Sequence, residues 1–484
     1  MNLREEVIVD SSDELPKRIV TLDILRGIAI FGMILVHVSY KLFQSDWLMD
    51  SIDSGNLDFG VFTWILIVIL GYLGTWHGFF LFISAIVNSL VFARKARAGV
   101  NPKKLLQKNL ISGTFIFVLG YFVEGLGYWG YFGTSFRNWS ITGNFVESFS
   151  SFRPFVAEGF FIQTLQVIGL AIIINGIILY FLLKDKGNEK VIRNTIIFGI
   201  LTVIVLFSTP FINDAIEKNM MIPNWPDINS LSGHKSFGVW LLTILCGPKF
   251  PLLPFLASAF MGSLIGVSLS DPKPKKKVLW NFVITGIVMI IIGALFVVIG
   301  FIKPDLPVNF QIFMFTTIEN PPAIGFYMVR LGGQIILVMI LLSQIEFKGK
   351  GEKFANNFVW KFFRRWGAFS LTIYSLHILE LLPRFLLTLV TQPTTGINLM
   401  EHQVIEKEYF WVIIFIVIYV LMFYELVVQI LIEVEMKGSM EWIFVKLQGL
   451  FSKVRSNKLD SGISTHVEWV DYSNQPSISE EKEK

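Results

Sequence analysis

The sequence predicts an all-α polytopic membrane protein, a bundle of about ten transmembrane helices with both termini in the cytoplasm. Three observations carry this prediction: an apolar composition, apolar blocks long enough to span a bilayer, and a Lys and Arg asymmetry between alternate loops. The 484 residues are 53% hydrophobic and 16% charged, whereas soluble domains carry about 25% charged residues. A soluble globule of this size could not bury so much apolar surface.

The composition also excludes several classes of protein. The apolar content excludes a cytosolic enzyme, a disordered chain and a nucleic-acid-binding protein. The formal net charge is only +4, so charge does not identify a partner. The single cysteine, Cys246, excludes an internal disulfide framework and a Cys-rich metal site.

Ten apolar stretches are long enough to cross a bilayer, which takes roughly 20 residues. They lie near residues 20–42, 76–93, 109–127, 158–183, 191–209, 250–270, 279–302, 322–345, 367–390 and 409–433. The period-two alternation of barrel strands does not occur, so the predicted spans are helices. Two further apolar stretches, 61–75 and 237–246, are predicted to be interfacial or re-entrant.

The basic residues of the loops predict the topology. The loops on the side of the N-terminus hold 30 Lys and Arg residues, and the loops on the other side hold 8. Because cytoplasmic loops collect Lys and Arg, the first group and both termini are predicted to be cytoplasmic. Counting 61–75 as a span would invert every later loop and destroy this bias.

The same pattern predicts the domain organisation. Residues 1–18 are predicted to form a cytoplasmic tail and residues 19–433 the transmembrane domain. Residues 434–455 are predicted to contain an amphipathic helix on the inner membrane surface, and residues 456–484 a disordered cytoplasmic tail. The localisation predicted for this architecture is the plasma membrane, with membrane lipids as partners.

The outer loops are polar and rich in aromatic residues. Trp129, Trp139 and Trp225 have side chains that are able to stack on a sugar ring. For any one of them, the aromatic belt at the membrane interface is the better explanation.

The first span carries the densest set of ionisable residues, and such residues inside a membrane are functional candidates. Arg26 and His37 are eleven residues apart, close to three helical turns, so they share one face and lie roughly 16 Å apart. Asp23 is one turn before Arg26 and can pair with it. This face is suited to a long ligand with its anionic end at Arg26 and its reactive end at His37. An arginine that snorkels beside Asp23 explains Arg26 about equally well, whereas a function is favoured for His37.

The segment TLDILRGIAIFGMILVH resembles the opening of transmembrane acyltransferases of the heparan-alpha-glucosaminide N-acetyltransferase and YeiB type. The related acyltransferase-three family has the same spacing of Arg and His. Other parts of the family pattern have counterparts over most of the chain. They are HGFFLFISAIVNSLVFARKAR (77–97), FPLLPFLASAFMGSLIG (250–266), RWGAFSLTIYSLHIL (365–379) and KGSMEWIF (437–444).

The resemblance implies an enzyme that transfers an acyl group from cytoplasmic acetyl-CoA, or another acyl-CoA, to an acceptor at the outer face. The acceptor would be an amine or hydroxyl of a glycan or amino sugar. Arg26 and His37 match the family motif, which implies CoA binding by Arg26 and catalysis by His37. The sequence departs from the animal lysosomal enzyme, which has Asn at the position of His37 and its catalytic His in the following loop. Residues 40–75 contain no His, so His37 is expected to act alone or with His77.

The ninth predicted span has a polar stripe at helical spacing that includes His377, Glu380 and Arg384. A buried network that fixes helix register is the favoured interpretation, and catalysis is the alternative. Glu124, Glu158, Arg330 and Glu425 are isolated charges in other spans, where each is able to pair with another. No metal-ligand spacing is present, so no metal is expected.

Arg94 and Arg365 belong to basic inner segments. The positive-inside bias and anionic lipid explain such segments first, and binding of the CoA phosphates is the second interpretation. The competing hypothesis for the whole chain is a secondary transporter that uses the same buried charges. The absence of evident inverted repeats favours the enzyme. The sequence leaves open the acceptor, the acyl chain and a homodimer.

Overall fold

The computed structural model describes residues 18–44, 61–155, 161–220, 236–271, 274–302, 323–405 and 410–452. Within these residues the chain is helical and forms no β-sheet. Nine of the described helices are long and apolar enough to cross a membrane. They are α1 (Val20–Leu42), α4 (Phe79–Arg97), α5 (Pro102–Leu126), α9 (Thr164–Leu183), α10 (Val191–Met220), α12 (Leu252–Leu269), α13 (Lys276–Ile302), α15 (Ile324–Gln344) and α20 (Phe410–Glu433). The predicted class, an all-α polytopic membrane protein, is confirmed, and the cytoplasmic position of both termini stays a prediction.

The stretch predicted as the ninth span, 367–390, differs from the prediction because it is not one helix. The chain forms four consecutive pieces: α17 (Phe358–Ala368), α18 (Ser370–Ser375), the 3₁₀ turn η5 (His377–Glu380) and α19 (Leu381–Thr395). Phe369 and Leu376 leave helical geometry, with ψ of 20° and 16°. From η5 the chain continues into α19 with helical geometry at Glu380 and Leu381, so the breaks lie before and after α18.

The two ambiguous apolar stretches fold as short helices. α3 (Val61–Gly74) has 14 residues and α11 (Phe237–Cys246) has 10, both shorter than a span requires. The end of α3 lies beside α1, with Gly74 facing Val36. The 3₁₀ turn η1 (Thr75–Gly78) then leads into α4. The chain therefore enters α4 from the end of the bundle at which α1 finishes.

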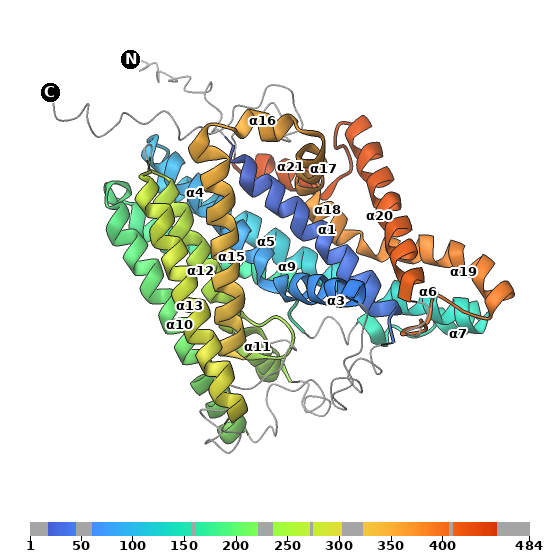
Figure 1. The fold of residues 1–484 in the computed structure, drawn as a ribbon. Coiled ribbons are helices and arrows are strands. Elements are labelled where there is room, and N and C mark those ends of the chain that lie inside the picture. Colours follow the sequence, from blue (N-terminus) through green and yellow to red (C-terminus); the bar gives the residue numbers. More distant parts are fainter. Residues whose placement is uncertain are drawn as a thin grey trace, which may run out of the picture.

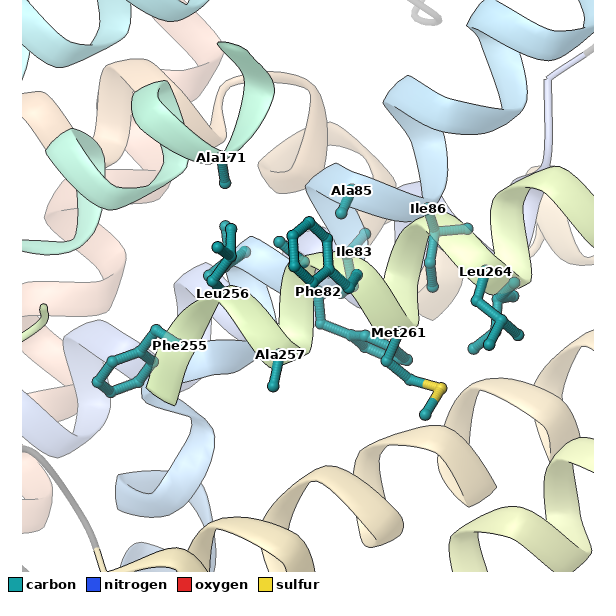
Figure 2. Packing of buried hydrophobic residues seen from close by; sticks show 14 of the residues in the cluster. Phe82, Ile83, Ala85, Ile86, Ala171, Phe255, Leu256, Ala257, Met261 and Leu264 are labelled. Atoms are coloured by element: carbon teal, nitrogen blue, oxygen red, sulfur yellow. The ribbon is translucent and has the colours of Figure 1, made fainter. Parts of the chain in front are cut away.

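Small residues allow the long helices to approach closely, as in membrane helix pairs generally. On α12, Gly262 and Gly266 lie against the backbone carbonyls of Phe82 and Ile86 on α4. Figure 2 shows the side chains around this contact, where Phe82 and Ile86 meet Met261 and Leu264 of α12. A shared apolar core thus joins α4, α9 and α12.

Figure 1 shows how the helices are grouped. α10, α13 and α15 lie together on one side, α1, α5 and α9 are central, and α19 and α20 lie on the opposite side. The remaining short elements are α6 (Tyr131–Thr142), α7 (Phe145–Phe149), η2 (Gly187–Glu189), η4 (Glu346–Lys348), α16 (Gly351–Asn356) and α21 (Met440–Ser452). Glu346 of η4 accepts hydrogen bonds from the backbone N–H and hydroxyl of Thr21, which fixes the start of α1.

α21 corresponds to the predicted amphipathic inner-surface helix, and one of its faces packs on the bundle. Glu441 binds α18, Phe444 packs on Phe115 of α5, and Gln448 donates to Ser112 of α5 at 2.7 Å. These three positions share one helix face. The predicted tails, 1–18 and 456–484, lie outside the described residues except for Arg18.

Candidate functional site

A cavity of about 370 Å³ lies at one end of the helix bundle. α1 and α5 finish at this end, whereas α4, α9 and α12 begin there. A backbone hydrogen bond of 3.3 Å from Phe250 to Ile162 joins the starts of α12 and α9. The titratable residues among those that line the cavity are His37, Lys41, Glu124, Lys249, Tyr374 and His377.

α1 contributes one continuous face to the cavity. Ala29, Met33, Val36 and His37 line it at helical spacing. Arg26 continues this face three residues before Ala29, as predicted, but is not among the lining residues. The structure therefore places His37 in the cavity wall, whereas Arg26 lies outside the cavity, nearer the start of α1.

His37 faces a second histidine across the cavity. The ring centroids of His37 and His377 are 6.5 Å apart. His377 Nδ1 lies 3.0 Å from the carbonyl oxygen of Tyr374, which only accepts, so Nδ1 carries a proton and Nε2 of the neutral ring is an acceptor. Tyr374 in turn donates its hydroxyl to Glu124 at 3.0 Å. The sequence favours a structural role for His377, whereas the structure places it in the cavity opposite His37.

Lys41 follows His37 by one helical turn and also lines the cavity. Its ammonium is 2.7 Å from the Glu380 carboxylate, and both side chains are almost fully buried. Arg384 lies 3.6 Å from the same carboxylate and donates to Tyr128 OH at 2.8 Å. Glu380 and Arg384 thus form the buried network predicted for them, and Lys41 is a third member that sequence reasoning missed.

Asp23 and Arg26 have different partners from those expected. The Asp23 carboxylate is held by Arg18 at 3.0 Å. The Arg26 guanidinium donates to Ser370 Oγ, at the start of α18, at 3.1 Å. α17 and α18 therefore cross α1 at the level of Arg26, a contact between segments more than 300 residues apart.

The other candidate CoA-binding residues lie away from the cavity. Arg94 is in the last turn of α4, at the end opposite the cavity. Arg365 on α17 is paired with Glu425 of α20 at 2.9 Å, so its charge is already partly compensated. A role for either residue in CoA binding stays a prediction.

His77, the second catalytic candidate, belongs to η1, and its side chain lies outside the described part of the chain. Trp225 lies outside it as well. Within the described ranges, no group of three or more His, Cys, Asp and Glu side chains is arranged to hold a metal ion.

Sequence reasoning missed three features of the cavity. Lys41 could have been found from its position one turn after His37. Lys249 lies just before α12, and nothing in the sequence joins it to α1. The hydrogen bond from Tyr374 to Glu124 depends on the approach of α5 to α18, which the sequence does not indicate.

No protein-family model matches this chain, and no curated protein matches it at a significant level.

Proposed function

We propose that this protein is an integral-membrane acyltransferase that moves an acetyl or other acyl group from acyl-CoA to an amine or hydroxyl of a glycan. The observation that carries the proposal is the cavity in which His37 and His377 lie 6.5 Å apart, with Lys41 and Glu124 in its wall. A pair of imidazoles in a polar cavity inside an apolar bundle is suited to proton transfer.

In the proposed reaction His37 is the general base. It accepts the proton of the acceptor N–H or O–H as that atom attacks the thioester carbonyl carbon. The carbon–sulfur bond then breaks, and the thiolate of CoA leaves and takes up a proton. His377, oriented by its bond to the Tyr374 carbonyl, is placed to position His37 or the acceptor. Direct transfer is preferred to an acyl-histidine intermediate because the long CoA arm is able to deliver the thioester itself.

The resemblance of the first span supports the same assignment. Arg26 and His37 match the Arg and His of the family motif, and both lie on the α1 face that leads into the cavity. In the proposed orientation the cavity is extracytoplasmic and Arg26 lies on the cytoplasmic side, where CoA enters. Both termini are then cytoplasmic, and the membrane is the plasma membrane.

The test is acetyl transfer by purified protein in proteoliposomes, with labelled acetyl-CoA and a panel of amino-sugar acceptors. His37→Ala is expected to keep its fold and CoA binding but to lose transfer by at least about 100-fold, the usual contribution of a general base. The control is Tyr40→Ala, on the same helix, because Tyr40 is 63% exposed. Near-normal turnover by the His37 variant would refute its role. Label retained on the protein without acceptor would favour the covalent route.

A secondary transporter is the second candidate, since Lys41, Lys249 and Glu124 place charges of both signs in the cavity. The same proteoliposomes separate the two functions. Accumulation of labelled sugar inside, without acetylated product, would support transport and overturn the acyltransferase proposal.

A further inference from the structure

The short helix α3 forms one wall of the cavity and also part of the outer surface of the bundle. Its last residues, 73 and 74, line the cavity. Another face of α3 points outward, and its side chains are 47–63% exposed: Ile65, Val68, Ile69 and Tyr72. Figure 1 shows α3 at the near side of the bundle, in front of α5 and α9. Within the described part of the chain, a single helix therefore separates the cavity from the surroundings on this side.

The outward face of α3 is suited to the hydrocarbon chains of lipids. The helix holds no charged residue, and the exposed side chains of this face are Ile, Val and Tyr. In a protein that spans a membrane, an exposed apolar face of this kind is a contact with lipid. We therefore expect lipid chains to lie directly behind the wall of the cavity.

α3 meets α1 along a narrow apolar seam. The Leu73 side chain lies 3.3 Å from the position that a β-carbon on Gly32 would take, and the Val36 side chain lies 3.8 Å from the corresponding position on Gly74. We refer to these four residues as the seam. Each side of the seam presents a glycine and an aliphatic side chain, which interact through dispersion forces. Because lipid chains are as apolar as these side chains, lipid contacts replace such interactions at little cost.

The polarity of the cavity changes along α1. Ala29, Met33 and Val36 line the part nearer the start of the helix, and His37 and Lys41 line the part nearer its end. Ala29 and Lys41 are separated by roughly 18 Å at the rise of an α-helix. The apolar part adjoins the seam, because the two seam residues of α1 also line the cavity.

A ligand that fills this cavity has one polar and one apolar end. In the polar part, His377 and Thr164 join His37, and these side chains are hydrogen-bonding partners for hydroxyl or amine groups. In the apolar part, Trp76 and Phe80 join the side chains of α1. A wholly hydrophilic ligand would leave the apolar part without favourable contacts, whereas an alkyl chain fits it.

We propose that the cavity opens sideways to the bilayer through the seam and binds an amphiphile of the outer leaflet. Its polar head lies beside His37 and His377, and its alkyl chain runs along Met33 and leaves between α1 and α3. In the proposed orientation, the head points to the membrane surface and the chain to the bilayer centre, as in the lipids of that leaflet. The inference rests on the proposed function only where it describes the head as the acyl acceptor.

The first experiment is photolabelling of the full-length protein in phosphatidylcholine nanodiscs. The probe is dodecyl glucoside with a diazirine on its alkyl chain. Label is expected on residues 29–36 of α1 and on α3, and an excess of unlabelled dodecyl glucoside should abolish it. Glucose, which is the head without the chain, should not compete. Label that an excess of dodecyl glucoside does not remove, or that glucose removes equally well, would overturn the proposal.

The variant Leu73→Trp narrows the seam, because it enlarges the side chain that faces Gly32. Its affinity for the probe is expected to be lower by at least about tenfold, which corresponds to roughly 1.4 kcal/mol. The matched control is Ile69→Trp, on the outward face of the same helix, which should bind the probe as the wild type does. Equal affinities of the two variants would contradict entry through the seam.

A reversible crosslink tests the seam even if Leu73→Trp does not fold. Gly32→Cys and Leu73→Cys are combined in a Cys246→Ala background and joined by a short crosslinker that a reductant cleaves. The crosslinked protein should lose the saturable label, and reduction should restore it. Undiminished labelling of the crosslinked protein would overturn the proposal.

The acyl chain of acyl-CoA is the other source of a hydrocarbon chain, and competition distinguishes it. If octanoyl-CoA displaces the probe better than acetyl-CoA does, the apolar part belongs to the acyl donor and the proposal is overturned. Equal effects of the two thioesters, or none, would support the amphiphile. Saturable labelling of a protein that acetylates no acceptor would support the amphiphile site and refute the proposed enzyme. Acetylation of free sugars without saturable labelling would overturn this inference and leave the proposed function intact.

Discussion

His402 lies in the loop after α19, where a proton on its ring would be repelled. Its Nε2 contacts the Arg137 guanidinium, and its ring stacks on Trp129. Partial burial, together with the Arg137 cation, lowers the pKa of His402 to about 4. The neutral ring accepts a hydrogen bond from Arg137, which the protonated ring could not do.

This pKa shift predicts a pH-dependent stability. The unfolded chain takes up a proton near pH 6.5, whereas folded His402 resists it down to about pH 4. Its stabilising effect is therefore present above about pH 6.5 and is lost as the pH falls toward the folded pKa. The apparent Tm of the wild type should fall more than that of His402→Gln between about pH 7.5 and about pH 5. Parallel pH profiles for the two proteins would contradict this.

The ammonium of Lys41 lies inside the bundle and not at the membrane interface. A lysine in the last turn of a span usually extends its ammonium to the interface. Here that ammonium is held inside the bundle by Glu380. A buried pair of this kind is weak support for stability but strong support for a specific arrangement, because removing one partner leaves the other uncompensated. The conformation of η5 and the end of α1 are thereby linked.

Among the elements, the contact between α1 and α17 depends on glycine. A methyl group on Gly27 would collide with the backbone carbonyl of Phe363, and one on Gly367 would collide with that of Asp23. The two backbones therefore touch, and Gly27, directly after Arg26, has a packing role in the motif of the first span.

The variant Gly27→Ala is expected to destabilise the protein by about 1–3 kcal/mol or more, the typical cost of overpacking. The measurement is the apparent Tm in detergent at a fixed scan rate. Gly333→Ala is the control, because Gly333 lies in helix α15 with nothing within 4 Å of the added methyl group. An unchanged Tm for Gly27→Ala would show that α1 and α17 are able to separate without cost.

The Glu441 carboxylate of α21 holds the first turn of α18. It accepts hydrogen bonds from the backbone N–H groups of Leu371 and Thr372, at 2.8 Å and 3.1 Å, and from the Thr372 hydroxyl. Such bonds satisfy amide groups that a helix start leaves without partners. α21 therefore supports the short helix that carries Ser370, the partner of Arg26.

Replacing Glu441 by Ala should cost about 1–3 kcal/mol, the penalty for leaving buried donors unsatisfied. The apparent Tm checks this, with Glu435→Ala as the control because Glu435 is exposed and its bridge to Lys437 lies at the surface. Glu441→Gln should recover part of the loss, since its amide oxygen is still an acceptor. Equal Tm values for the Glu441 and Glu435 variants would exclude this role of α21.

At the scale of the whole molecule, the helix ends that surround the cavity indicate which side of the membrane the cavity faces. The residues that line the cavity come from the ends of α1 and α5 and from the starts of α4, α9 and α12. These ends correspond to the loops that are poor in Lys and Arg, so the cavity is expected to face outward.

The topology predicts opposite labelling of two exposed positions. Val100 follows α4 in a basic loop, and Val146 on α7 is 78% exposed. In a Cys246→Ala background, Val100→Cys should react with an impermeant maleimide only from the cytoplasmic side, and Val146→Cys only from outside. In the wild-type protein, the buried Cys246 should not react with the maleimide from either side. Labelling of position 100 from outside would invert the proposed direction of acyl transfer.

The sequence by itself determined the class of fold and most of the spans. A segment of about 20 apolar residues must form a helix in a bilayer whatever its neighbours are, because its backbone groups have no other partners. For the same local reason, the sequence placed Arg26 and His37 on one helix face.

Only the tertiary structure decided which side chains contact Asp23, Arg26 and His37. Asp23 binds Arg18, whereas Arg26 donates to Ser370 on α18. The continuous helix expected over 367–390 is broken at Phe369 and Leu376. His377, Lys41 and Lys249 join His37 only because helix ends far apart in the sequence converge on one cavity. Contacts of this kind depend on how close-packed helices pair, which the periodicity of a single helix does not encode.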